Sequence, residues 1–323
     1  MEENPHINIV VKSATGSGKT LAYLIPAISN VLSKPYKPGT EILIVVPTRD
    51  LAVQVMKHLN VLFQHTDFEK DWMSFCGVIT GGRKRKQNLF FLHKYPKILV
   101  GTCGVLTELL TEGVIPTHNI DMVILDEIDQ TVKMGYNEDL MAILNFASNA
   151  QIMGFSATAT NTVTTQIEKI SGSKFKLLNL NEDELTNVDI HHYSILMENN
   201  RTLDNVVKII SDLKHMFLGI NNDTNTLIFC QKRLEVDALG SELRAKNLNT
   251  FNNIYQIHAD FKQDERNKVM TAFQNGGNNL LIGTSAMARG MDLPLVDLVI
   301  HMGTRQHSAE EYIHSREFEI IDI

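Results

Sequence analysis

The sequence lacks several features that define whole classes of protein. No uninterrupted apolar run approaches the roughly 20 residues that a helix needs to cross a bilayer. Residues 1–5 have neither the basic flank nor the apolar core of a secretion signal. The three cysteines are scattered without metal-ligand spacing, and there is no tandem repeat or low-complexity tract. These absences argue against a membrane protein, a disulfide scaffold, a zinc module and a repeat array. We therefore expect an intracellular protein, cytoplasmic or nuclear or in an organelle. We also expect it to act as a monomer.

An excess of positive charge is also absent. Lysine and arginine total 30, aspartate and glutamate total 37, and the net charge is −7. Any binding of nucleic acid must therefore come from local basic groups within an acidic whole. The basic run at residues 83–86 is such a group, but on its own it is more typical of a solvated face.

A phosphate-binding loop is present near the start of the chain. Residues 13–20 read Ser-Ala-Thr-Gly-Ser-Gly-Lys-Thr and stand between an apolar run at 7–11, expected as a strand, and a helical pattern at 21–32. Glycines allow several backbone N–H groups to point at one anion, and the helix dipole adds positive charge there. Lys19 is placed to reach the β- and γ-phosphates, and the Thr20 hydroxyl to hold Mg²⁺. Ser13 stands where such loops usually begin with glycine.

Short apolar runs alternate with helical patterns along the whole chain, which predicts an α/β fold with parallel sheets. The expected strands are residues 7–11, 42–46, 75–80, 97–101, 122–125 and 152–155, then 226–230, 254–258, 280–283 and 296–301. A polar, acidic stretch interrupts the series. We predict a first doubly wound domain at 1–180, a linker at 181–189, and a second α/β domain at 190–323 that is incomplete at its C-terminus.

An acidic pair follows one of the expected buried strands. Asp126 and Glu127 come directly after residues 122–125. Acidic residues in this place are usually helix caps. With a phosphate loop earlier in the chain, Asp126 is instead expected to orient Mg²⁺ and Glu127 to position or deprotonate an attacking water.

The chain resembles a DEAD-box ATP-dependent RNA helicase over nearly its full length. The motifs that carry the resemblance are, in order, residues 14–20, 47–52 with Gln54, Gly81-Gly82, 126–129, 156–158, Gln263 with Arg266, and 288–292. Single motifs are weak, whereas the ordered set is specific. The resemblance implies two RecA-like domains, RNA as a partner bound through its backbone, and ATP with Mg²⁺ as cofactors.

The resemblance also implies a role for each matching residue. Nucleotide binding falls to Thr15, Gly16, Ser17, Gly18, Lys19, Thr20 and Asp292. Catalysis and its coupling to RNA fall to Lys19, Asp126, Glu127, Ser156 and Thr158, and the metal to Thr20 and Asp126. The RNA path falls to Thr48, Arg49, Gly82, Thr102, Gly104, Gln263, Arg266 and Thr284.

Departures from the family pattern leave an alternative open. No glutamine that could read adenine precedes the phosphate loop, Ile128 replaces a usual alanine, and Val105 replaces an arginine. Phe318 stands at the place of a catalytic arginine. The alternative is a truncated, catalytically impaired module that binds nucleotide or RNA without turnover. A related ATPase acting on DNA also stays open, because threonines along the path do not distinguish the two nucleic acids.

Overall fold

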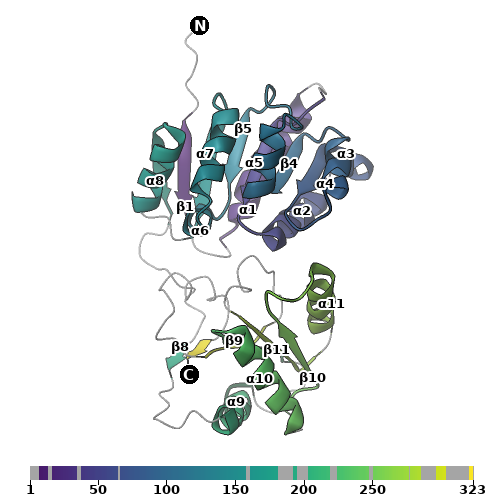
Figure 1. Cartoon of the computed structure of the whole chain (residues 1–323), viewed down its shortest axis with the longest axis vertical. Helices are drawn as coiled ribbons and strands as arrows, with labels where there is room; N and C mark the ends of the chain where they lie inside the picture. The colour runs from purple at the N-terminus through teal and green to yellow at the C-terminus, as the bar shows by residue number, and fades with distance from the viewer. Residues whose placement is uncertain are drawn as a thin grey trace. The chain divides into compact units, whose positions relative to one another are not determined.

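The structure is a computed structural model (Figure 1), and it describes residues 7–13, 17–34, 38–64, 66–157, 161–180, 192–194, 203–218, 224–246, 250–275, 277–284, 296–302 and 320–322. The chain divides into two compact units, Met1–Glu184 and Leu185–Ile323. Each unit is built on its own parallel sheet.

The sheet of the first unit has seven strands in the order β3-β4-β2-β5-β6-β1-β7. Its strands are β1 (Asn8–Lys12), β2 (Ile42–Val46), β3 (Cys76–Ile79), β4 (Ile98–Thr102), β5 (Met122–Leu125), β6 (Gln151–Ser156) and β7 (Phe175–Asn179). Every pair is parallel, and in the centre Ile44 is aligned with Val100 on one side and Ile124 on the other. All residues of β2 are buried, as expected for a strand covered on both faces.

Helices cover both faces of this sheet (Figure 1). They are α1 (Lys19–Ser33), α2 (Arg49–Phe63), α3 (Trp72–Phe75), α4 (Arg85–Leu92), α5 (Cys103–Thr111), α6 (Ile128–Lys133), α7 (Asn137–Phe146) and α8 (Asn161–Ser171), with a 3-10 turn at Glu69–Asp71. One apolar core joins α1 and α2 to the sheet, and another joins α5, α7 and α8 to the opposite face. With both faces covered, the loops that follow the strands are left at the sheet edge, where open α/β sheets bind ligands.

The second unit has a parallel sheet in the order β10-β11-β9-β12-β13-β8. Its strands are β8 (His192–Ser194), β9 (Thr226–Cys230), β10 (Asn253–Ile257), β11 (Asn279–Thr284), β12 (Leu298–His301) and β13 (Ile320–Asp322). Its helices are α9 (Leu203–Leu218), α10 (Arg233–Ala245) and α11 (Gln263–Gln274). The helices α9 and α10 pack on one face of the sheet, and Phe273 of α11 packs on the other.

The predicted α/β class and parallel sheets are confirmed, and β2, β5 and β9 begin and end at the predicted residues. The run at 75–80 was predicted too long, because Phe75 belongs to α3. Strands β7, β8 and β13 were not predicted: two have three residues each, and β7 has no fully buried position. The predicted linker, 181–189, lies outside the described residues. No helix in the described part of the chain is long and apolar enough to cross a membrane.

Candidate functional site

Three strands of the first sheet end side by side at the phosphate loop. The strands β5, β6 and β1 are neighbours, and beyond their ends the Ser13 N–H donates to the Ser156 carbonyl oxygen at 3.1 Å. Gly18 caps α1 in the left-handed region at φ 85°, and nothing lies within 4 Å of a Cβ added there. Among the described residues, none crowds Gly18 at the N-terminus of this 15-residue helix, where the helix dipole attracts anions. Thr15 and Gly16 lie outside the described residues.

Lys19 is folded over this loop. Its Nζ donates to the Ser13 carbonyl oxygen at 2.9 Å, and the Ser13 and Ser17 hydroxyls are 2.5 Å apart. The ammonium group is near enough to Asp126 that its charge acts to lower the pKa of that carboxyl. The loop thus holds a cation next to a carboxylate, with Thr20 at the second position of α1.

Asp126 is buried and held on both carboxylate oxygens. The Tyr23 hydroxyl donates to Oδ2 at 2.8 Å, and the Glu127 N–H donates to Oδ1 at 3.0 Å. Burial raises the pKa of Asp126, and the Tyr23 hydrogen bond, the Glu127 N–H and the Lys19 charge oppose that rise. The two fixed oxygens give the carboxylate one orientation, which suits a group that positions a hydrated cation.

Tyr23 is a site residue that sequence reasoning missed. It is fully buried on α1 and packs on Phe155 with ring centroids 5.1 Å apart. Burial, followed by the charge of Asp126, raises the pKa of Tyr23 well above its ordinary value, so the phenol stays a donor. The available signal was its spacing: Tyr23 follows Thr20 by three residues and so lies close to it on the same side of the helix.

The turn after Asp126 has an unusual backbone. Glu127 adopts φ 47° as the cap of α6, a left-handed conformation that non-glycine residues rarely occupy. Ile128, bulkier than the family's usual alanine, is fully buried, and its Cδ1 lies 3.0 Å from where a Cβ on Gly154 would stand. The glycine thus provides the room that the larger side chain needs. Asp129 and Ser156 are also buried there.

A second cluster forms at the same sheet edge, beyond the ends of β2, β3 and β4. The Arg49 guanidinium lies against the backbone of Gly82, so closely that a Cβ on Gly82 would stand 2.1 Å from Nη1. Gly82 has φ 73°, and the preceding Gly81 N–H donates to Thr102 Oγ1 at 3.2 Å. Three predicted RNA contacts from three separate segments are thereby brought together.

The other predicted RNA-binding and coupling residues of the first unit lie at the ends of strands or the starts of helices. Thr48 caps α2, and its hydroxyl accepts from the Leu51 N–H at 3.2 Å. Gly104 stands in the first turn of α5, with open space where a Cβ would be. Ser156 ends β6, and Thr158 lies outside the described residues.

The predicted site residues of the second unit are described only in part. Arg266, on α11, donates from Nη2 to the Ala259 carbonyl oxygen at 3.0 Å. Gln263 begins α11 and Thr284 ends β11. Asp292 lies outside the described residues.

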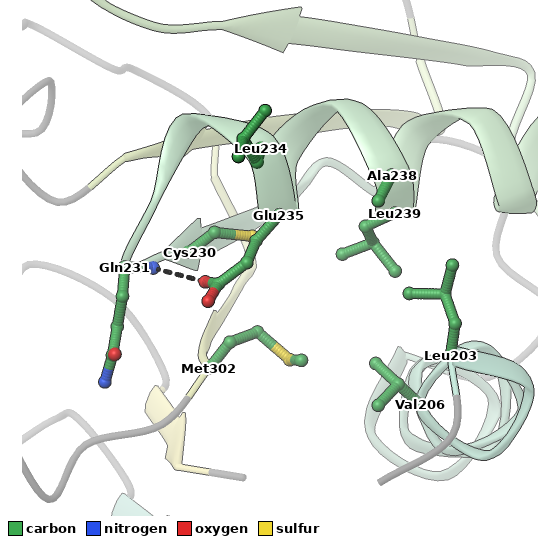
Figure 2. Close-up of a pocket in the computed structure, with 9 residues that line it drawn as sticks. All are labelled: Leu203, Val206, Cys230, Gln231, Leu234, Glu235, Ala238, Leu239 and Met302. Carbon is green, nitrogen blue, oxygen red and sulfur yellow. Dashed lines mark hydrogen bonds between the residues drawn. The ribbon is translucent and has the colours of Figure 1, made fainter.

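The second unit also contains a cavity of about 370 Å³ (Figure 2). It lies between α9 and α10, and mostly apolar side chains line it: Leu203, Val206, Cys230, Gln231, Leu234, Glu235, Ala238, Leu239 and Met302. Among these lining residues, the Glu235 carboxylate accepts from the Gln231 N–H at 3.0 Å (Figure 2). None of the predicted site residues lines this cavity, so it is not the candidate site.

The donors and acceptors of the first cluster fit a nucleoside triphosphate with Mg²⁺. The loop supplies a lysine and a helix N-terminus for phosphate oxygens, and Asp126 and Thr20 supply the oxygen ligands that a hard cation prefers. We find no such fit in the second unit, whose described part has no glycine-bearing turn between a buried strand and a helix N-terminus.

Comparison with known proteins supports the same interpretation. The family model of the DEAD/DEAH box helicase matches residues 3–166, and that of the helicase conserved C-terminal domain matches residues 206–317. ATP-dependent RNA helicase DBP3 of Saccharomyces cerevisiae is 31% identical over 319 residues, which cover 95% of this chain and 56% of the relative. ATP-dependent RNA helicase eIF4A of Neosartorya fischeri is 29% identical over 309 residues, and the match covers 95% of this chain and 72% of that relative. The chain thus spans about half the length of the DBP3 relatives it matches.

Solved structures show the same fold. Mss116p bound to ssRNA and AMP-PNP matches with a TM-score of 0.85 at 23% identity, covering 99% of this chain and 67% of that one. S. cerevisiae Dbp5 bound to RNA and ADP BeF3 matches with a TM-score of 0.77 at 22% identity, covering 99% and 80%. A family model that covers half of the chain, a second model that covers most of the remainder, and the clusters around Asp126 and Arg49 agree. The chain belongs to the DEAD/DEAH box helicase family.

Proposed function

We propose that this chain is an ATP-dependent RNA helicase or RNA-remodelling ATPase that binds single-stranded RNA by its backbone. One observation supports this most strongly: two different ligand clusters share the carboxyl edge of one sheet. The phosphate loop and Asp126 lie beyond β1, β6 and β5, and Arg49 with Gly82 lies beyond β2 and β3. The Asp126 N–H donates to Val45 of β2 at 3.0 Å, so the backbone of one cluster is joined to the strand that carries the other.

In the nucleotide site, each residue has a role that its position allows. Residues 15–20 bind phosphate oxygens, Lys19 leaves the Ser13 carbonyl to reach them, and Asp292 meets the ribose. Thr20 and Asp126 hold Mg²⁺, which when bound neutralises charge on the transferred phosphate. Glu127 orients the attacking water and accepts its proton. Ser156, with Thr158, couples the nucleotide state to RNA binding.

In the RNA site, the proposal assigns positive and polar groups to phosphates and 2′-hydroxyls. The first domain uses Thr48, Arg49, Gly82, Thr102 and Gly104, and the second uses Gln263, Arg266 and Thr284. Contacts of this kind are largely independent of sequence, and each neutralised phosphate adds about 0.7 to the salt slope of affinity. Such a grip needs few cations, which agrees with a net charge of −7.

The remaining assignments belong to the same proposal. We assign residues 1–180 to the ATP-binding domain, 181–189 to a linker and 190–323 to the second RecA-like domain, and we propose that the protein acts inside the cell as a monomer. Phe318, one of the departures that motivated a catalytically impaired alternative, lies outside the described part of the chain.

Phosphate release from ATP, measured with and without single-stranded RNA, tests the proposal. RNA should stimulate hydrolysis, and Lys19→Ala and Glu127→Gln should each abolish it. Binding of an ATP analogue or of RNA with no measurable phosphate release would instead favour the impaired module. Competition between RNA and DNA strands of equal length decides between the two nucleic acids.

A further inference from the structure

The basic run at residues 83–86 leads into a surface that none of the functions above explains. Helix α4 packs on β3, the edge strand of the first sheet. Its Leu89 and Leu92 pack on one core of the unit and Phe91 on the other. The buried Asn88 side chain pairs with both the N–H and the carbonyl of Thr80, at 3.2 and 3.1 Å. These contacts fix the helix, and with it the side that faces solvent.

That side carries a ridge of alternating charge and aromatic surface. Lys86 and Phe90 are four residues apart on α4, so they follow one line along the helix, and Lys94 lies in the turn just beyond its end. Phe90 is 57% exposed, and the Lys94 ammonium lies 5.3 Å from its ring centroid. Single exposed aromatic residues are common and need no explanation, but one flanked on both sides by lysines is a specific arrangement.

The positive charge of the ridge is left uncompensated, unlike that of its neighbour. Arg85 forms ion pairs with Glu108 and Glu112. Among the described residues, neither Lys86 nor Lys94 forms an ion pair, and residues 72–107 contain no aspartate or glutamate at all. Glu108 and Glu112 are thus engaged by Arg85, and the charges of the ridge itself are both positive, which attracts polyanions.

Tyr95 adds an independent observation. It follows Lys94 at the end of α4, where its N–H donates to the Leu92 carbonyl, and it is 53% exposed at φ 51°. Glycine adopts this left-handed backbone most readily, and a bulky residue there is strained. An exposed aromatic ring on a strained backbone contributes little to the stability of the fold, so binding is the better reason for it.

We propose that the strip formed by Lys86, Phe90, Lys94 and Tyr95 is a second RNA-binding surface, which contacts single-stranded RNA beyond the segment held by Arg49 and Gly82. Aromatic faces that stack on bases, next to ammonium groups that meet phosphates, are the recurring means of holding single strands without regard to sequence. The inference rests on the proposed function, because it extends the same RNA strand.

The position of the strip fits that role. Two residues separate Gly82 from the start of α4, which then runs about 12 Å along the edge of the sheet. A stacked strand advances about 3.4 Å per nucleotide, so about four further nucleotides bring RNA from Gly82 to Tyr95. The strip should therefore matter only for RNA longer than the shortest oligonucleotide that the protein binds.

A length series of labelled oligouridylates, bound in the presence of a non-hydrolysable ATP analogue, tests the proposal. Phe90→Ala should weaken binding of a 20-mer about tenfold and leave the shortest bound RNA unaffected. Lys86→Gln with Lys94→Gln should lower the salt slope for the 20-mer by about 1.4. The matched controls are Phe146→Ala and Lys169→Gln, which replace exposed residues on α7 and α8. They should leave the affinity for both the 20-mer and the shortest RNA unchanged.

A second variant distinguishes loss of RNA binding from loss of folding. Tyr95→Gly removes the ring and relieves the backbone strain, so it should weaken binding of the 20-mer without lowering the melting temperature. Equal loss of affinity at all RNA lengths, no loss at any length, or the same loss in the controls would overturn the proposal. If the strip instead binds an acidic protein partner, the variants will lose no affinity for RNA at any length. Failure of the wild-type chain to bind even the shortest RNA would overturn the proposed function itself.

Discussion

Replacing Gly82 with alanine tests whether the position of Arg49 matters for gripping RNA. The added Cβ would stand 2.1 Å from Arg49 Nη1 and 2.4 Å from Cζ, in a backbone with φ 73°. To restore a contact of 3.4 Å, the guanidinium must withdraw by at least about 1.3 Å. The displaced group is the far end of a flexible side chain, so the steric clash itself costs the fold little.

The expected effects on stability and on binding can be separated. Alanine in a left-handed conformation costs about 1–2 kcal/mol, which for a unit of this size lowers the melting temperature by about 2–8 °C. Losing a charged hydrogen bond from Arg49 to a phosphate costs a further 1.5–3 kcal/mol of binding, about 10- to 150-fold in Kd. Thermal unfolding and fluorescence anisotropy with labelled RNA measure the two quantities.

Gly113→Ala provides a matched control. Gly113 has φ 71°, and nothing lies within 4 Å of a Cβ added there, so the same backbone cost arises without any displaced arginine. The control should lose a similar amount of thermal stability and keep full affinity for RNA. Our account of the Arg49 cluster is wrong if Gly82→Ala binds RNA as tightly as Gly113→Ala does.

Three further predictions concern buried polar groups of the two units. Lys97 and Glu41 form a buried ion pair, so Lys97→Met should lower the unfolding free energy by about 3–5 kcal/mol in urea titrations, and adding Glu41→Leu should restore most of it; additive losses would contradict this. Burial raises the pKa of the Cys230 thiol to about 12, whereas in the unfolded chain it is about 8.5. The stability that the protonated thiol contributes is therefore complete below pH about 8.5. Between these two pKa values the unfolding free energy falls by about 1.4 kcal/mol per pH unit. Urea unfolding between pH 8 and 10 should therefore show a flatter profile in Cys230→Ala, and equal profiles would refute the assignment. Tyr23→Phe removes a donor to Asp126 and should raise the Mg²⁺ concentration needed for half-maximal binding of a fluorescent ATP analogue; an unchanged Mg²⁺ dependence would show that the phenol does not orient the carboxylate.

The identities and order of the chemical groups could be predicted from the sequence because they are local properties of the chain. A glycine-bearing turn between a strand and a helix binds phosphate wherever it occurs, so Lys19 and Thr20 could be found by spacing alone. Continuous apolar runs such as β2 could be assigned as doubly covered strands for the same reason. The strands that sequence reasoning missed, such as β7, have too little periodicity to stand out from their surroundings.

The sequence by itself therefore determined the α/β class, the family and most candidate residues. Only the tertiary structure decided which of those residues meet. The Tyr23 hydroxyl reaches Asp126 across 103 positions, Gly154 provides room for Ile128, and Arg49 lies on Gly82 because the order β3-β4-β2 places their loops together. Strand order and side-chain packing depend on burial between residues far apart in the chain, so they cannot be predicted from the spacing of neighbouring residues.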